Sequence, residues 1–181
     1  MLRQNSLIRS KSPGFTLVES MVVVALLSIL TALAAPSMRE AFDSYRSNEA
    51  FDELRSSYAL ARSEAIRNRS PVLIQANACA SASSWECGWT IFAVINGVNQ
   101  TVKTIEARTG GTTITTFKGT APFNSVTFDR WGNRTPVETM RQVIAPGGDS
   151  TAAGTRTLCS SAGGRIRSLT GVQGDVACNA Q

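Results

Sequence analysis

Few residues in this chain could perform chemistry. The sequence of 181 residues has no histidine, and this removes the commonest general base and the commonest metal ligand. Without histidine, no serine or cysteine can be activated in a Ser-His or Cys-His pair, and the 13 acidic residues form no recognisable catalytic motif. The phosphate-binding pattern GxxxxGKS/T does not occur either. We therefore expect a protein that is not an enzyme and that has no metal site and no cofactor.

The segment SSAGGRIRSLTG, near the C-terminus, is a candidate binding site. Arg165 and Arg167 alternate about Ile166, so on an extended strand both guanidinium groups would point to one face and the isoleucine to the core. The preceding glycines, Gly163 and Gly164, permit unusual backbone angles and the close approach of a polyanion. Two arginines on one edge suit contacts with backbone phosphates. The same letters also suit a terminal strand whose arginines are only solvated, and the sequence leaves both interpretations open.

The charge balance limits how this chain could bind anions. The formal net charge of +5 comes from 18 basic and 13 acidic residues. Without residues 1–14, 15 basic residues would remain against 13 acidic ones, a charge of +2. A protein that coats DNA through its overall charge is therefore not indicated, and anion binding must come from local clusters. Arg130, Arg134 and Arg156 would widen the cluster at Arg165 if the fold gathers them.

The four cysteines are expected to form disulfides. They have neither the CxxC spacing of zinc sites nor histidine partners, and an even number of cysteines after an export-type segment is typical of disulfide pairs. Four cysteines allow three pairings. We favour the nearest-neighbour pairing, Cys79–Cys87 and Cys159–Cys178, because each pair brackets a turn-rich segment.

The N-terminal segment contains one charged residue inside an apolar run, where a charge is energetically unfavourable. Residues 2–13 are polar and basic, and an almost wholly apolar run, long enough for a membrane-spanning helix, follows from Phe15 to Pro36. This order predicts that the N-terminus stays in the cytoplasm while the rest of the chain crosses the membrane. Glu19 lies within the run, although an acidic side chain at the centre of a bilayer costs about 2.5–3.5 kcal/mol. An ordinary signal peptide would be cleaved near ALAAPSM, at the end of the run; the alternative is cleavage before the run.

The order of residues GFTLVE, from Gly14 to Glu19, resembles the class III signal of type IV pilins and type II secretion pseudopilins. The resemblance implies that a prepilin peptidase cleaves after Gly14 and methylates the new N-terminal residue, Phe15. Glu19 is then the fifth residue of the mature chain, where its carboxylate would neutralise the α-amine of an adjacent subunit in a filament. Its place in the first turn of the helix also suits the helix dipole. Pro36 falls where the family commonly has a proline.

The rest of the chain changes from a helical to a strand pattern at Pro71. One apolar stripe at helical spacing precedes it and comprises Phe51, Leu54, Tyr58, Ala61 and Ala65. We expect this stripe to pack on a sheet and the helix to end before Pro71, because a residue that precedes proline avoids the α region. Short apolar or alternating runs separated by turns then predict about seven antiparallel strands. We assign Trp89 to the core, and we favour a structural role for Trp131 in the DRWGN turn.

Four fragments resemble one branch of the pilin superfamily, the GspH/FimT/FimU group of minor pilins and pseudopilins. They are LARSEAIRNRSPV, CGWTIF, VTFDRWGNRTP and GRIR, and with the N-terminal signal they span Gly14 to Arg167. The resemblance implies an α+β type IV pilin fold, in which a long N-terminal helix packs on an antiparallel β domain. We expect residues 1–14 to be the leader peptide, 15–37 the transmembrane and filament-core half of the helix, 38–70 its amphipathic half, and 71–181 the β-rich globular domain.

The function that this resemblance implies is that of a minor pilin of a type IV pilus, which primes assembly or lies near the tip. It would be a single-pass protein of the bacterial inner membrane before assembly and part of the pilus on the cell surface afterwards. Its partners would be other major and minor pilins and the prepilin peptidase. By resemblance to pilins that serve natural transformation, Gly164, Arg165 and Arg167 are also candidates for non-specific contact with the DNA backbone. The alternative is a type II secretion pseudopilin of the GspH type.

Overall fold

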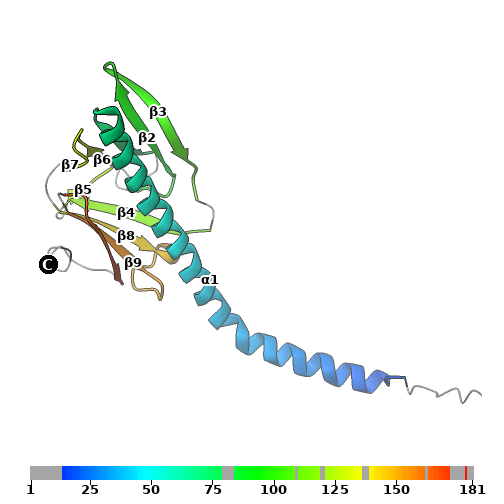
Figure 1. Cartoon of the computed structure of the whole chain (residues 1–181). Coiled ribbons are helices and arrows are strands. Elements are labelled where there is room, and N and C mark those ends of the chain that lie inside the picture. Colours follow the sequence, from blue (N-terminus) through cyan, green and yellow to red (C-terminus); the bar gives the residue numbers. More distant parts are fainter. Residues whose placement is uncertain are drawn as a thin grey trace, which may run out of the picture. The chain divides into compact units, whose positions relative to one another are not determined.

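The computed structural model describes residues 14–78, 84–108, 110–118, 121–135, 139–161, 163–171 and 178. The chain divides into two compact units, Met1–Met38 and Arg39–Gln181, which we describe separately. One α-helix, α1 (Leu17–Asn68), contributes its first part to the N-terminal unit and its remainder to the second unit (Figure 1).

The described part of the N-terminal unit is helical from Leu17 onward, and its side chains from Leu17 to Ala34 are exposed. Within the described residues, Leu17–Ala34 is the one stretch that is long and apolar enough, by length and composition, to cross a membrane, and none of it is buried. Thr16 precedes the helix, and its side-chain oxygen accepts a hydrogen bond from the backbone N–H of Glu19 at 3.2 Å, as an N-cap residue does. The apolar surface of this segment therefore needs a cover of lipid or of other helices.

The remainder of α1 supplies one apolar stripe to the core of the second unit. The buried hydrophobic residues on it are Ala50, Phe51, Leu54, Tyr58, Ala61 and Ala65. The stripe predicted from the sequence is therefore confirmed. The helix ends at Asn68, because Arg69 has a φ of 51° and the N–H of Ser70 donates to the carbonyl oxygen of Ala65 at 3.2 Å. The predicted end before Pro71 is also confirmed.

In the described part of the chain, ten strands form two five-stranded antiparallel sheets. The first sheet has the order β3-β2-β1-β6-β7 and consists of β1 (Val72–Ala76), β2 (Trp89–Ile95), β3 (Val98–Ile105), β6 (Ser125–Phe128) and β7 (Arg134–Thr135). The second has the order β10-β9-β8-β4-β5 and consists of β4 (Thr113–Lys118), β5 (Ala121–Pro122), β8 (Met140–Ala145), β9 (Arg156–Ser160) and β10 (Ile166–Thr170). A short 3₁₀ helix, η1 (Pro146–Gly148), follows β8. The sequence predicted about seven strands and missed three: β5 and β7 are too short to show a period of two, and β8 is buried at five of its six positions and does not alternate.

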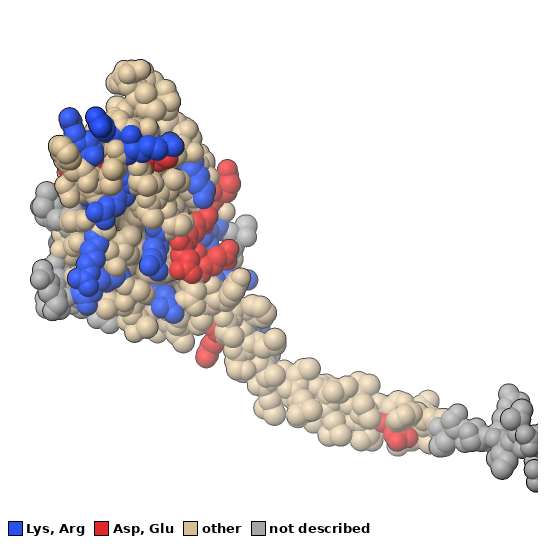
Figure 2. Space-filling model, viewed as in Figure 1, with Lys and Arg blue, Asp and Glu red and all other residues tan. Residues whose placement is uncertain are grey.

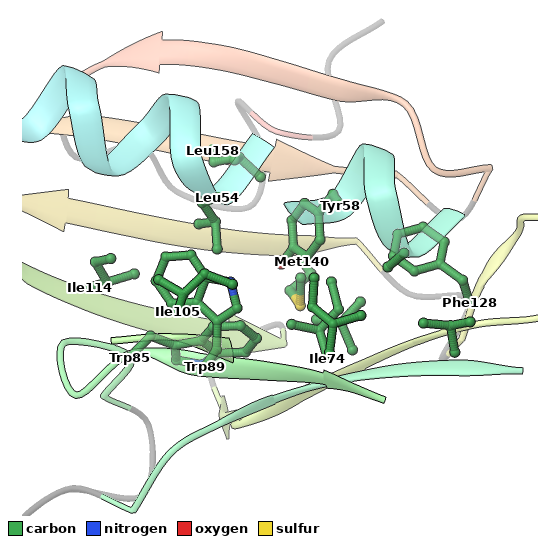
Figure 3. Packing of buried hydrophobic residues seen from close by; sticks show 14 of the residues in the cluster. Leu54, Tyr58, Ile74, Trp85, Trp89, Ile105, Ile114, Phe128, Met140 and Leu158 are labelled. Atoms are coloured by element: carbon green, nitrogen blue, oxygen red, sulfur yellow. The ribbon is translucent and has the colours of Figure 1, made fainter. Parts of the chain in front are cut away.

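The core lies between the helix and the two sheets. Figure 3 shows Leu54 and Tyr58 of α1 facing side chains of both sheets, among them Trp89 and Met140. Trp85 and Trp89 are fully buried, with ring centroids 6.0 Å apart. The buried residues of this cluster all lie in the second unit. We therefore expect residues 39–181 to fold without the N-terminal unit.

Two neighbouring residues of α1, Ser57 and Tyr58, each form a hydrogen bond with a different sheet. Oγ of Ser57 accepts a hydrogen bond from Nε1 of Trp89 in β2 at 2.9 Å. The hydroxyl of Tyr58 donates to Oε1 of Gln142 in β8 at 2.7 Å, and Nε2 of Gln142 donates to Oγ1 of Thr116 in β4 at 2.9 Å. Burial raises the pKa of Tyr58 well above its usual value, so the phenol keeps its proton and remains a donor. Buried polar groups that are paired in this way fix the position of the helix.

A disulfide closes the C-terminal part of the chain. Cys159 in β9 is bonded to Cys178, with their Cα atoms 5.3 Å apart. This is the C-terminal pair that we favoured from the sequence, and strand β10 lies between its two cysteines in the chain. Cys87 is disulfide-bonded as well, and Cys79, its expected partner, lies outside the described residues.

Removing the bond between Cys159 and Cys178 should destabilise the second unit. The double variant Cys159→Ala, Cys178→Ser opens a loop with a sequence separation of 19 residues. For a loop of this size, the chain-entropy relation gives a loss of about 3 kcal/mol in the free energy of unfolding. Urea unfolding of residues 39–181, followed by tryptophan fluorescence, measures the loss. Ser168→Ala, at an exposed position between the two cysteines, is the control, and a double variant as stable as this control would contradict the prediction.

Candidate functional site

The predicted processing site lies ahead of the helix. Gly14, Phe15 and Thr16 are not helical, and Phe15 is exposed. Gly14 is also exposed, and a β-carbon on it would meet no atom within 4 Å. Glu19 is exposed in the first turn of α1, where its charge interacts favourably with the free backbone N–H groups of the helix. The junction and the carboxylate are therefore both accessible.

The Gly–Gly segment forms a tight turn between β9 and β10. The N–H of Ser161 donates to the carbonyl oxygen of Arg165, and the N–H of Gly164 donates to that of Ser161, both at 3.0 Å. The N–H of Arg165 donates to Oγ of Ser161 at 3.2 Å. Gly164 has a φ of +77°, and a β-carbon on it would lie 3.2 Å from Nη1 of Arg62 and 3.3 Å from the carbonyl oxygen of Gly132. Glycine therefore suits both the backbone angle and the close approach of α1.

The two candidate arginines differ in exposure. Arg165 precedes β10 and is exposed, whereas Arg167 lies within β10 and is half-buried, opposite Cys159 in β9. Ile166, between them, packs against the buried cluster. Arg165 is therefore the more open of the two to a polyanion.

Arg134 belongs to the interior of the domain. It begins β7, is 1% exposed, and donates from Nη2 to the carbonyl oxygen of Ser160 at 3.2 Å and from Nε to that of Ser161 at 3.4 Å. It thereby anchors the turn between β9 and β10. Arg156 lies at the opposite end of this hairpin, where it pairs with Thr170. The fold therefore does not gather Arg134 and Arg156 at an exposed cluster.

A second turn, Asp129–Asn133, lies beside the first. The carboxylate of Asp129 accepts hydrogen bonds from the backbone N–H groups of Trp131 and Asn133, at 2.9 and 2.8 Å. Burial works to raise the pKa of Asp129, but hydrogen bonds from Asn133 and Trp131 outweigh it and hold the pKa below its usual value. A β-carbon on Gly132 would lie 2.8 Å from Cδ1 of Ile66, so the turn packs on the end of α1. Trp131 is 74% exposed.

These contacts bring three segments together at one surface. We call it the arginine–tryptophan surface and define it as Arg62 and Ile66 of α1, Arg130 and Trp131 of the second turn, and Arg165 of the first turn. Within the described residues, none of its three arginines makes an ion pair. Figure 2 shows many basic side chains gathered on one side of the second unit, and acidic side chains gathered on another. The surface therefore combines positive charge with an exposed aromatic ring.

Elsewhere on the same unit, α1 and β3 border an open pocket of about 460 Å³, which we call the acidic pocket. Its lining residues are Tyr45, Asn48, Glu49, Asp52, Glu53, Ser56 and Lys103. Glu53 is paired with Arg108. Glu49 and Asp52 are exposed, and neither makes an ion pair with a described residue. Among the described residues, no group of three or more His, Cys, Asp or Glu side chains is arranged to hold a metal ion.

The neighbours of Arg165 could be predicted only in part. Trp131 was placed in the DRWGN turn with partial exposure allowed and a structural role favoured, and it is largely exposed. Aspartate followed three residues later by glycine, as in Asp129 and Gly132, is a turn signal that could have indicated an exposed tip. No local sequence pattern could place Arg62 next to either turn, because this contact depends on how the end of α1 packs against Gly132 and Gly164.

Two family comparisons match different parts of the chain. Residues 50–174 match the family described as type II transport protein GspH, and residues 9–35 match the prokaryotic N-terminal methylation motif. No match is found among curated proteins.

Two crystal structures of the type IV minor pilin FimU from Pseudomonas aeruginosa strain PAO1 have a similar fold. Their TM-scores are 0.57 and 0.56, each at 24% sequence identity. The matches cover 70% of this chain and 95% and 98% of the two FimU chains. The fold, with a long N-terminal helix packed on antiparallel sheets, is therefore that of type IV pilins. Because the GspH match covers more than half of the chain, the protein belongs to the GspH family of pilin-like structural proteins and carries the prokaryotic N-terminal methylation motif.

Proposed function

We propose that this chain is a minor pilin of a type IV pilus, which primes assembly or lies near the tip. Residues 15–37 would hold it in the bacterial inner membrane before assembly. In the filament, on the cell surface, it would pack with other major and minor pilins. Prepilin peptidase would prepare it by cleaving after Gly14 and methylating Phe15.

The N-terminal segment carries this proposal. Its helix, Leu17–Ala34, is apolar and exposed, and burying each large aliphatic side chain is worth about 1.5–3 kcal/mol. Lipid can bury these apolar side chains, but it leaves the carboxylate of Glu19 without an opposite charge. In a filament, the α-amine of a neighbouring Phe15 supplies that charge. An apolar helix with one acid in its first turn therefore suits transfer from lipid into a bundle of similar helices of other pilins.

Deleting the gene in its host and fractionating the cells tests the proposal. Sheared pili should contain the chain, and its deletion should lower the number of pili while type II secretion continues. The similarity to FimU, a type IV minor pilin, favours this outcome. The alternative is a pseudopilin of a type II secretion system, favoured by the family description. Normal piliation combined with a loss of secretion would establish that alternative.

Weak contact with the DNA backbone is a second candidate function. The observation in its favour is the exposed guanidinium of Arg165, on a turn that also lies against Arg62. About two to four phosphates could be neutralised here, which predicts micromolar or weaker affinity and a salt slope of about −0.9 per phosphate. Base edges would not be read, because none of the described segments resembles a groove-inserted helix with ordered polar side chains.

Replacing Arg165 and Arg167 by glutamine should weaken duplex binding and flatten its salt dependence by about one per arginine. Titration of residues 39–181 with a short duplex at two salt concentrations measures both. Arg156→Gln, which removes one charge from the opposite end of the hairpin, should bind as the parent does. No binding by the parent at low salt, or equal binding by the double variant, would reduce Arg165 to a solvated surface residue.

A further inference from the structure

We propose that a groove beside α1 docks an acidic segment of a different pilin-like subunit, and that Arg62 binds one carboxylate of that segment. The inference rests on the proposed function, because it needs neighbouring subunits that are other pilins. The groove has a volume of about 240 Å³ and lies between α1, the end of β6 and the start of β10. We call it the arginine groove, and its lining includes Arg55, Tyr58, Ala59, Arg62, Phe128 and Ile166.

One side of α1 supplies the charge of this groove. Arg55, Ala59, Arg62 and Ile66 follow one another at intervals of three or four residues, so they lie along one side of the helix. Within the described residues, neither Arg55 nor Arg62 has an ion pair or a hydrogen bond from its guanidinium. The described part of the chain therefore leaves the positive charge on this side of the helix without an opposite charge.

Packing fixes the side chain of Arg62 before any partner binds. Arg62 is half-buried and lies against two turns: a β-carbon on Gly132 would be 3.1 Å from its Nε, and one on Gly164 would be 3.2 Å from its Nη1. A side chain that is already held in this way loses little freedom on binding. The planar guanidinium can pair with both oxygens of a carboxylate, and such charge-assisted hydrogen bonds are stronger than neutral ones. Arg62 is therefore a positioned receptor for a carboxylate.

The floor of the groove is apolar. Tyr58 and Phe128 are almost fully buried, and their rings meet edge to face with centroids 6.0 Å apart (Figure 3). Ile166 of β10 is half-buried beside them. Next to the groove, the exposed Ile66 packs on the turn that carries the exposed Trp131. An apolar side chain beside the bound carboxylate would cover this floor and exclude water from the ion pair, as the neighbours of an interface hot spot do.

The same chemistry argues against two other occupants. A DNA duplex presents phosphates but stacks the apolar faces of its bases inside, so its backbone would leave the floor of the groove in contact with water. Two copies of this chain that met groove to groove would bring like charges together, which opposes binding. An acidic segment of a different subunit suits both the guanidinium groups and the apolar floor.

A photo-crosslinking amino acid at Ala59 tests which molecule occupies the groove. The full-length chain with this substitution is produced in its host, and irradiated membranes and sheared pili are analysed by mass spectrometry. Ala59 is exposed in the groove, so this position should be joined to another pilin, at a peptide that contains aspartate or glutamate. Ser63, exposed on α1 outside the lining of the groove, is the control position and should not be joined to that peptide.

Charge reversal tests the ion pair. Arg62→Glu should weaken the binding of residues 39–181 to the globular unit of the crosslinked pilin at least about 30-fold, because it places like charges in a partly buried contact. Reversing the crosslinked acid to arginine should have a similar effect, and combining the two reversals should restore most of the affinity. Titration calorimetry measures all four pairings.

Two further variants make the result specific. Arg55→Glu changes an exposed position, so it tests the groove even if Arg62→Glu disturbs the two turns, and it should weaken binding about 5-fold. Lys103→Glu reverses an exposed charge in β3, outside the groove, and should bind as the parent does. The inference is overturned if Ala59 is joined to no other pilin, to a second copy of this chain or to DNA. Paired reversals that fail to restore binding would also overturn it.

The fate of the proposed function is read separately. If sheared pili contain the chain but Ala59 is joined to no other pilin, this inference fails and the minor pilin function stands. If Ala59 is joined to an acidic segment of a type II secretion pseudopilin, and the paired reversals restore binding, the docking contact stands and the minor pilin function fails.

Discussion

Replacing Glu19 by alanine should leave the chain in the membrane and remove most of it from filaments. The change eliminates a charge that costs about 2.5–3.5 kcal/mol at the centre of a bilayer, so insertion is not weakened. In the filament it leaves the α-amine of a neighbouring Phe15 without its opposite charge, and such an uncompensated buried charge costs about 3–5 kcal/mol. That penalty lowers the equilibrium constant for incorporation at least about 100-fold.

Immunoblots of membrane and sheared-pilus fractions measure both effects. Glu40→Ala is the matched control, because it removes another exposed acid of α1 and should leave both fractions unchanged. A Glu19→Ala chain that reaches the pilus fraction in parental amounts would show that the carboxylate does not pair with the amine.

Replacing Gly88 by alanine should lower the free energy of unfolding of residues 39–181 by about 2–6 kcal/mol. Gly88 has a φ of +82°, and a β-carbon on it would lie 2.0 Å from the carbonyl oxygen of Ile105 and 2.8 Å from the carbonyl carbon of Glu106. The backbone cannot move away freely, since the N–H of Gly88 donates to Trp85 and its carbonyl oxygen accepts from Asn77. Backbone strain and overpacking, each worth about 1–3 kcal/mol, therefore add.

Gly97→Ala separates these two effects. Gly97 has a φ of +78°, but a β-carbon on it would meet no atom within 4 Å. The Gly97→Ala substitution should therefore lower the free energy of unfolding only by the backbone strain, about 1–2 kcal/mol. Urea unfolding of both variants gives the comparison, and equal losses would mean that the crowding at Gly88 has no energetic consequence.

The parts of the fold that could be predicted from the sequence are those with a local period or a fixed order. The apolar stripe through Leu54 and Tyr58 repeats every three or four residues, and the helix packs along it. The N-terminal motif is a run of consecutive residues, so its match to the methylation motif needs no knowledge of the fold. Trp89 lies in an alternating strand whose buried positions follow the period of two.

Contacts between distant segments could not be predicted in this way. Arg134 is close in sequence to the exposed Arg130 and Trp131, yet its guanidinium is buried against carbonyl oxygens of Ser160 and Ser161. Its burial depends on the packing of β7 beside the end of β9, which no local pattern encodes. Trp131 is exposed for the complementary reason, because the Asp129 carboxylate organises the turn from within and leaves the ring outside.

In the candidate site, too, the local motif could be predicted from the sequence and the contacts between distant segments could not. The sequence identified Gly164, Arg165 and Arg167 as a group, and the structure places them on a turn and the strand that follows it. It could not foresee that the turn lies against Arg62, because that contact joins residues about 100 positions apart in the sequence. The acidic pocket likewise needs β3 beside α1, and the charges on the helix alone do not predict it.

The mass of the mature N-terminus tests the account most directly. The chain would be extracted from the inner membrane of its host, and its N-terminal peptide analysed by mass spectrometry. The account predicts a chain that begins at Phe15 and carries one methyl group on its α-amine. A strain without prepilin peptidase should instead retain residues 1–14. A mature chain that begins after Ala35, as cleavage of an ordinary signal peptide would leave it, lacks both Phe15 and Glu19 and would contradict the assignment to a filament.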